Sequence, residues 1–134
     1  MNKNIAKTQL LDLYKIAISD GIIDKNEYRF MLDIGRNYGL EENEILDIIN
    51  KNIDFEMQEA ISFNERMQHL FQMLFLMKID GKVKASEIQT LKNIALYLGI
   101  NLNMTEELIN IIQKHKQNNV PVSEMIEIVK LHLN

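Results

Sequence analysis

The chain has 134 residues, of which 46% are hydrophobic and 25% are charged, so it is expected to fold as one globular domain and not to be disordered. It contains no cysteine, which excludes disulfides and thiolate metal sites, and its single proline and five glycines favour long helices. The net charge of −4 lies mainly in the first half and the lysines form no stripe, so nucleic-acid binding is not expected.

The apolar runs near the N-terminus are interrupted by Asp12 and Lys15. Neither a signal peptide nor a membrane span is therefore predicted, and we expect a cytoplasmic protein. Peripheral association with a membrane complex stays open as an alternative.

Three helices are predicted in the first half of the chain, over residues 5–19, 25–38 and 42–51. The first is apolar on more than one side, which predicts a buried position at the centre of the fold. Gly21 and Gly39 are expected to stop the first two helices, because glycine takes the left-handed conformation without strain. Residues 53–62 are interpreted as a linker.

The second half of the chain predicts the same order of helices, over residues 63–79, 85–98 and 104–116. Ser62 and Glu65 have the spacing of a capping box at the first of these helices. Asn103 is expected to cap the third, which implies three additional residues in the loop before it. A final amphipathic helix over 122–133 has no equivalent in the first half, and its predicted apolar stripe consists of Val122, Met125, Ile126, Val129 and Leu133.

The two halves match at an offset of 60 residues. The identities fall on turn and cap positions: Asp20-Gly21 with Asp80-Gly81, Glu27 with Glu87, and Gly39 with Gly99. This pattern predicts a tandem duplication, with repeat one over about 5–52 and repeat two over about 62–116. The expected fold is an all-α single domain over residues 1–134, with about seven helices, in which two helix–Asp-Gly turn–helix repeats are related by a pseudo-twofold axis.

The segment from Asp20 to Glu27 is similar to the second half of an EF-hand calcium loop. With Gly21 at the sixth loop position, the first and third positions are Ile16 and Ile18 in repeat one, and Leu76 and Lys78 in repeat two. Calcium requires oxygen ligands at these positions, so neither repeat can form a functional EF-hand loop.

Two interpretations of the acidic turn residues stay open. In the first, Asp24 and Glu27 form a capping box, and Asp20 accepts hydrogen bonds from turn amides that offset its unfavourable place at a helix C-terminus. In the second, carboxylates from both repeats converge on a divalent cation. Lys84, which stands where repeat one has Asp24, weakens the second interpretation.

No catalytic constellation is recognisable. His69, His115 and His132 lack the spacing of metal ligands, so structural roles are predicted for them. A glycine-rich phosphate loop and a nucleophile elbow are both missing from the sequence. We therefore do not expect an enzyme, and the one cofactor under consideration is a divalent metal ion.

Both repeats resemble the TerB-like family, named for a tellurite-resistance protein. The resemblance covers about residues 5–115 and is carried by AISDGIIDKNE (17–27) through YGL (38–40), and by DGKV (80–83) and Glu87 through LGI (98–100). It implies an all-helical, internally duplicated, non-enzymatic module associated with tellurite resistance, stress response and membrane-linked complexes. It also implies a metal-chelating set, which in this sequence is Asp20, Asp24, Glu27, Asp80 and Glu87. The alternative is a protein–protein interaction or scaffold domain that binds no metal and uses its terminal helix.

Overall fold

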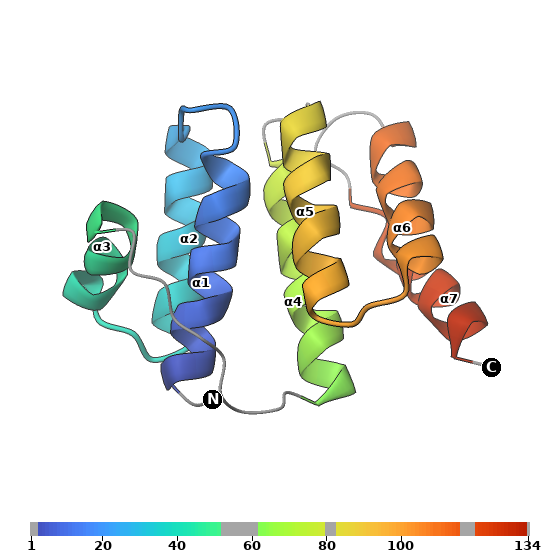
Figure 1. Cartoon of the computed structure of the whole chain (residues 1–134), viewed down its shortest axis with the longest axis horizontal. Helices are drawn as coiled ribbons and strands as arrows, with labels where there is room; N and C mark the ends of the chain where they lie inside the picture. The colour runs from blue at the N-terminus through green and yellow to red at the C-terminus, as the bar shows by residue number, and fades with distance from the viewer. Residues whose placement is uncertain (1–2, 52–61, 80–82, 116–119, 134) are drawn as a thin grey trace.

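The computed structural model describes residues 3–51, 62–79, 83–115 and 120–133, and within these ranges it contains seven α-helices and no strand (Figure 1). The all-α class is thus confirmed, and the predicted helix ends differ from the observed ones by at most two residues. The helices are α1 (Lys3–Ala17), α2 (Lys25–Asn37), α3 (Glu42–Lys51), α4 (Phe63–Lys78), α5 (Ala85–Tyr97), α6 (Leu102–Lys114) and α7 (Val122–His132). Most of the predicted linker, 53–61, lies outside the described residues.

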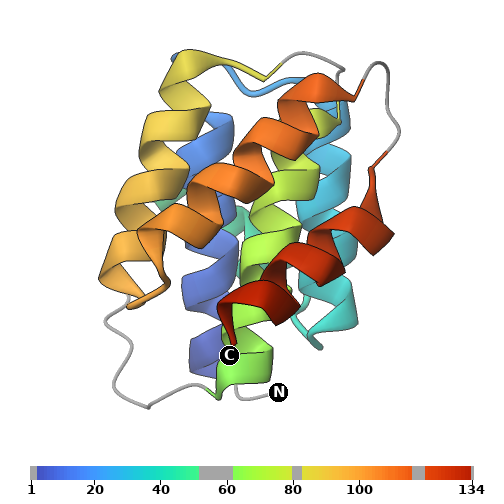
Figure 2. The same cartoon turned by 90° about the vertical axis from the view of Figure 1, so that its right-hand side faces the viewer.

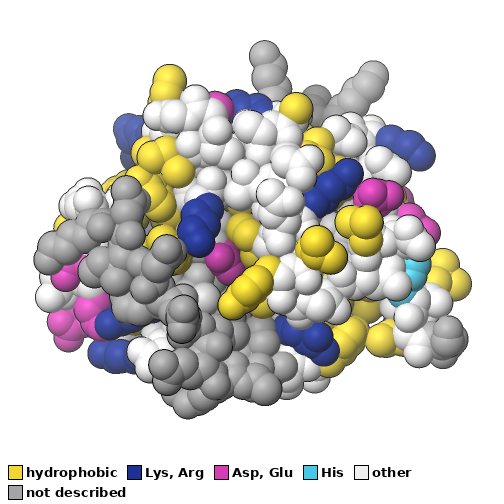
Figure 3. Space-filling model, in the orientation of Figure 1, with side chains coloured by type: hydrophobic (Ala, Val, Ile, Leu, Met, Phe, Trp, Pro, Cys, Tyr) yellow, Lys and Arg dark blue, Asp and Glu magenta, His cyan; other side chains and the backbone are white. Residues whose placement is uncertain are grey.

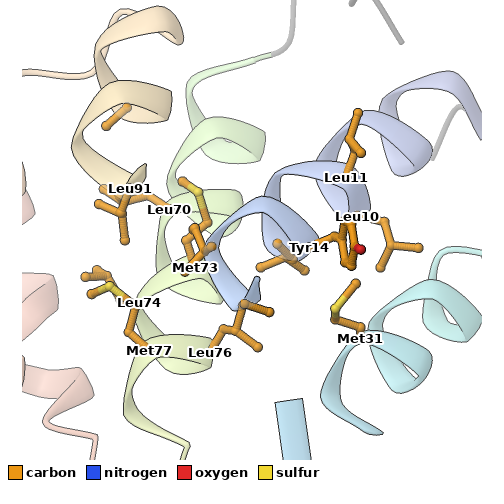
Figure 4. Close-up of a cluster of buried hydrophobic side chains, with 14 of the residues drawn as sticks. Leu10, Leu11, Tyr14, Met31, Leu70, Met73, Leu74, Leu76, Met77 and Leu91 are labelled. Carbon is orange, nitrogen blue, oxygen red and sulfur yellow. The ribbon is translucent and has the colours of Figure 1, made fainter. Parts of the chain in front are cut away.

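The central position predicted for the first helix of each repeat is confirmed. Helix α1 packs against α2, α3, α4 and α5, and α4 packs against α1, α5 and α6. Their side chains fill the core shown in Figure 4, and the fully buried members from these two helices include Leu10, Leu13, Ile16, Leu70, Met73 and Leu76. Burying one such side chain contributes about 1.5–3 kcal/mol relative to leaving it exposed, so the α1–α4 contact is a main source of stability.

The start of α6 corrects one prediction. The helix begins at Leu102, and its cap is Asn101, whose Oδ1 accepts a 2.9 Å hydrogen bond from the Met104 amide; the predicted cap Asn103 is wrong. The chain leaves α5 as it leaves α2, with Ile100 N donating to Ala95 O at 2.9 Å and Leu40 N donating to Gly35 O at 2.9 Å. The two glycine-ended turns therefore have the same length, and the three additional loop residues that were expected do not exist.

Helix α7 packs along α6, and Figure 2 shows these two helices as the outermost layer of the second half. Of the predicted apolar stripe, Met125 is buried and Val129 is half-buried, but Val122, Ile126 and Leu133 are exposed. The buried face instead includes Ile128, which was not predicted. A helix at the edge of the fold with a single main neighbour buries a narrow face, and this geometry explains why much of its apolar surface remains uncovered.

Candidate functional site

The first Asp-Gly turn links α1 to α2 and has the predicted backbone. Gly21 has a φ of +92°, in the region that favours glycine. One carboxylate oxygen of Asp20, Oδ1, accepts a 3.2 Å hydrogen bond from the Ile22 amide. The turn therefore supplies the compensating amide that Asp20 was expected to need.

The second carboxylate oxygen of Asp20 binds a side chain of the other repeat. Lys84 Nζ lies 2.6 Å from Asp20 Oδ2, and this contact, together with the Ile22 amide, holds the pKa of Asp20 below its usual value. Beside it, the Ser19 and Ser86 hydroxyl oxygens are 3.1 Å apart. These two contacts join the turn of repeat one to the first turn of α5, and we call them the inter-repeat clasp.

Asp24 and Glu27 form the predicted capping box at α2. Asp24 Oδ1 accepts hydrogen bonds from the amides of Asn26 at 2.7 Å and Glu27 at 3.0 Å, while Glu27 Oε1 accepts one from the Asp24 amide at 3.3 Å. These bonds satisfy amides that the start of a helix leaves without partners. The capping interpretation of this pair is confirmed.

The start of α5 keeps half of the same arrangement. Glu87 Oε1 accepts a 2.9 Å hydrogen bond from the Lys84 amide, and Lys84 itself, having no acceptor, provides no side-chain cap. Glu27 and Glu87 are 1% and 2% exposed, and both have interactions beyond these bonds. Buried carboxylates require such partners, so the two glutamates anchor both helix starts in the core.

The proposed metal set is described in four of its five members, because Asp80 lies outside the described residues. Within the ranges that the structure covers, no group of three or more histidine, aspartate or glutamate residues is arranged to hold a metal ion. The carboxylates of Asp20, Asp24 and Glu27 instead face amides and the Lys84 ammonium. The chemistry of the described members is therefore helix capping and ion pairing.

Buried polar side chains lie on both α1 and α4, where the sequence predicted apolar packing. His69, predicted to be structural, is fully buried, and its Nε2 lies 2.9 Å from Oδ2 of the nearly buried Asp12. The residues equivalent to His69 and Asp12 at the offset of 60 are Gln9 and Gln72, so both repeats place two polar residues three positions apart. Both amide atoms of Gln9 and the Nδ1 of His69 lack a hydrogen-bond partner among the described residues. The three-residue spacing of these polar residues, which recurs in both repeats, is the sequence signal from which a buried polar pair could have been predicted.

Two further buried polar groups lie next to helix ends. Lys78 Nζ donates to the backbone carbonyl of Ile112 at 2.9 Å and also to that of His115, at the C-terminus of α6 where a cation is favourable. Burial raises the pKa of Tyr38, and the nearby Gln72 side chain offsets part of that rise. Lys78, which in the sequence is only a residue that a calcium loop could not accept, therefore caps the C-terminus of α6.

Exposed large hydrophobic side chains are unevenly distributed. Among the described residues, Ile22 is the single example before residue 62, and the others are Phe63, Leu96, Tyr97, Leu102, Val122, Ile126, Leu131 and Leu133. Figure 3 shows hydrophobic side chains at the lower right, over the ends of α5 and α7 and the start of α6, and also at the centre and the upper left of this face. None of the described helices combines the length and hydropathy that a membrane crossing requires.

Comparison with known proteins finds no family model that matches the chain, and no curated protein or solved structure that matches it significantly.

Proposed function

We propose that this chain is a non-enzymatic, TerB-like interaction module that binds a protein partner through the outer surface of its second repeat and α7. The observation that carries the proposal is the concentration of exposed large hydrophobic side chains on that half of the molecule, with Leu96 68%, Tyr97 78% and Leu131 71% exposed. Exposed apolar surface of this kind is typical of protein interaction sites. Tellurite resistance or a stress response is the setting that the family resemblance implies.

The TerB-like arrangement of two repeats about a pseudo-twofold axis is part of this proposal. Its support is the recurrence of helix bounds at the offset of 60: α2 and α5 match at both ends, and α3 and α6 match at their first residues. The glycine-ended turns at Gly39 and Gly99, with φ of +82° and +74°, recur at the same offset. In this arrangement the inter-repeat clasp, which includes the ion pair of Asp20 and Lys84, stabilises the contact between the two repeats.

Co-purification of the full chain from its native cells tests the interaction proposal. The wild type is compared with a Leu96→Glu/Leu131→Glu variant, and an Ile22→Glu variant serves as the matched control, because Ile22 is equally exposed but lies on repeat one. A protein retained by the wild type and the control but lost from the double variant supports the proposal. If every co-purifying protein is retained equally by all three chains, the proposed surface is wrong.

A divalent-cation site at the Asp-Gly turns is the second candidate function. The burial of Glu27 and Glu87 at the starts of α2 and α5 favours it, because carboxylate oxygens are suitable cation ligands. The test is the melting temperature during titration with Ca²⁺, Mg²⁺, Mn²⁺ and Zn²⁺, for the wild type and an Asp20→Ala/Asp80→Ala variant. Saturable stabilisation of the wild type alone supports a site, and no shift with any ion at millimolar levels refutes it.

A further inference from the structure

A pocket of about 160 Å³ opens between the start of α4, the loop from α5 to α6, and the end of α7. Its apolar lining consists of Phe63, Met67, Ile100, Met104 and Leu133, and its polar lining consists of Arg66, Asn101 and His132. An apolar cavity of ~150 Å³ holds a benzene-sized ring, so this pocket has room for one large apolar side chain.

The equivalent positions of repeat one carry ion pairs in place of apolar side chains. At the offset of 60, Phe63, Met67 and Met104 correspond to Lys3, Lys7 and Glu44. Lys3 Nζ lies 3.3 Å from Glu44 Oε1, and Lys7 Nζ lies 3.4 Å from Glu44 Oε2. Glu44 also accepts a 3.1 Å hydrogen bond from the Glu41 amide at the start of α3, and that bond together with Lys3 lowers the pKa of Glu44. Repeat one therefore holds a carboxylate of its own at this position.

Repeat two has apolar residues in place of both lysines and of that carboxylate, and it has a cation at a different position. Arg66 stands where repeat one has Ala6, and its guanidinium Nη1 donates to the Leu98 carbonyl at 3.3 Å while the group lies 5.9 Å from the centre of the Phe63 ring. Arg66 has no carboxylate partner among the described residues, and its Nε is buried without a hydrogen bond. The first turn of α6 contains no acidic residue, whereas that of α3 contains Glu42 and Glu44, so the positive end of the α6 dipole is also uncompensated by charge.

We propose that this pocket docks a segment of another protein that presents a large apolar side chain next to a carboxylate. The apolar side chain fills the space between Phe63, Met67 and Met104, and the carboxylate pairs with Arg66. The partner thus supplies a carboxylate for Arg66, which has no carboxylate partner among the described residues. This inference rests on the proposed interaction function and adds to it a site and the chemistry of the partner.

A protein segment fits this surface better than a small amphiphilic acid does. The elements around the pocket expose further apolar side chains outside its lining, including Leu96, Tyr97 and Leu131, and a ligand that fills about 160 Å³ would leave these uncovered. Arginine, methionine and aromatic residues at one concave place, surrounded by a wider apolar area, are typical of the anchor positions in protein interfaces.

The closing experiment selects peptides from a displayed random 12-residue library on the full wild-type chain. The counter-target is a closure variant, Phe63→Lys/Met67→Lys/Met104→Glu, which copies the ion pairs of repeat one into repeat two. Selected peptides are synthesised, and their affinity is measured by fluorescence anisotropy for the wild type, the closure variant, Arg66→Met and Arg66→Lys. Circular dichroism verifies that each variant is folded. If the closure variant does not fold, Arg66→Met still tests the pocket.

We expect peptides that contain Asp or Glu beside Leu, Ile, Phe or Met. Arg66→Met should weaken binding about ten-fold or more, because it removes a charge-assisted hydrogen bond, and Arg66→Lys should restore part of it. Replacing the Asp or Glu of the peptide by Asn or Gln should not weaken its binding to Arg66→Met any further. Rising salt should weaken binding to the wild type.

Several outcomes would overturn the inference. Peptides that bind the closure variant and Arg66→Met as well as the wild type place the interaction elsewhere, and the broader interaction proposal then stands alone. Failure to select any peptide refutes the pocket as a peptide site, while the co-purification test decides the broader proposal separately. Binding of decanoate or of phosphatidylglycerol vesicles that depends on Arg66, with no selected peptide, would assign the pocket to an acidic amphiphile instead.

Discussion

The hydrogen bond between His69 and Asp12 gives the most direct test of how the core is assembled. The pair links α1 to α4 at the centre of the fold, with His69 0% exposed and the ring nitrogen Nε2 2.9 Å from the carboxylate. The perturbation is a double-mutant cycle made of Asp12→Ala, His69→Leu and the combined variant. A matched control is Gln9→Leu, because Gln9 is equally buried at the equivalent position of repeat one and its amide has no partner among the described residues.

The expected magnitudes follow from what each change leaves unpaired. Asp12→Ala leaves both ring nitrogens of His69 without a partner in the core and should cost about 1–3 kcal/mol. His69→Leu leaves a carboxylate with an apolar neighbour and should cost ~2–4 kcal/mol, somewhat less than for a fully buried charge because the Asp12 side chain is 12% exposed. The double variant removes both groups, so we expect a coupling energy of about 1.5–3 kcal/mol. Gln9→Leu should be neutral or stabilising, since it removes an unsatisfied amide.

The assay is urea unfolding at pH 7 and 25 °C, followed by circular dichroism. With a slope of about 1–3 kcal/mol/M, a loss of 2 kcal/mol lowers the unfolding midpoint by roughly 1 M. A coupling energy below about 0.5 kcal/mol would mean that the pair does not act as a unit. A Gln9→Leu variant destabilised as much as His69→Leu would show that buried polar groups stabilise the fold without a hydrogen-bond partner, and the reasoning from individual hydrogen bonds would then be wrong.

Two further predictions concern charges at helix ends. The lowered pKa of Asp20 implies stability that is present above the usual value of 3.8 and is lost as the pH falls through the lower folded-state value. The stability difference between wild type and Asp20→Asn, measured by urea unfolding from pH 7 to pH 2, should therefore vanish at the acid end. A difference that does not change with pH would contradict the clasp. Lys78→Met should destabilise the chain by about 1–3 kcal/mol, because the carbonyls of Ile112 and His115 lose their donor. It should also accelerate amide hydrogen exchange in the last turn of α6, and unchanged exchange there would refute the capping role.

The sequence by itself determined the features that depend on neighbouring residues. The helices, the left-handed Gly21, the capping boxes at Asp24 and Ser62, and the central position of the first helix in each repeat all follow from periodicity and cap spacing, and the structure confirms them. The wrong prediction of a cap at Asn103 also concerns a feature that depends on neighbouring residues. Two asparagines, 101 and 103, compete there, and the Gly99 turn, which matches the turn of repeat one, decides for Asn101.

Only the tertiary structure decided the contacts between residues far apart in the chain. Asp20 and Lys84 are 64 residues apart, and Asp12 and His69 are 57 apart, so no local pattern could pair them. In the sequence Lys84 only weakens the case for a symmetric metal site, whereas in the fold it is the partner of Asp20. These pairings depend on where α1 lies against α4 and α5. That position is set by the burial of many apolar side chains together, and no single short motif encodes it.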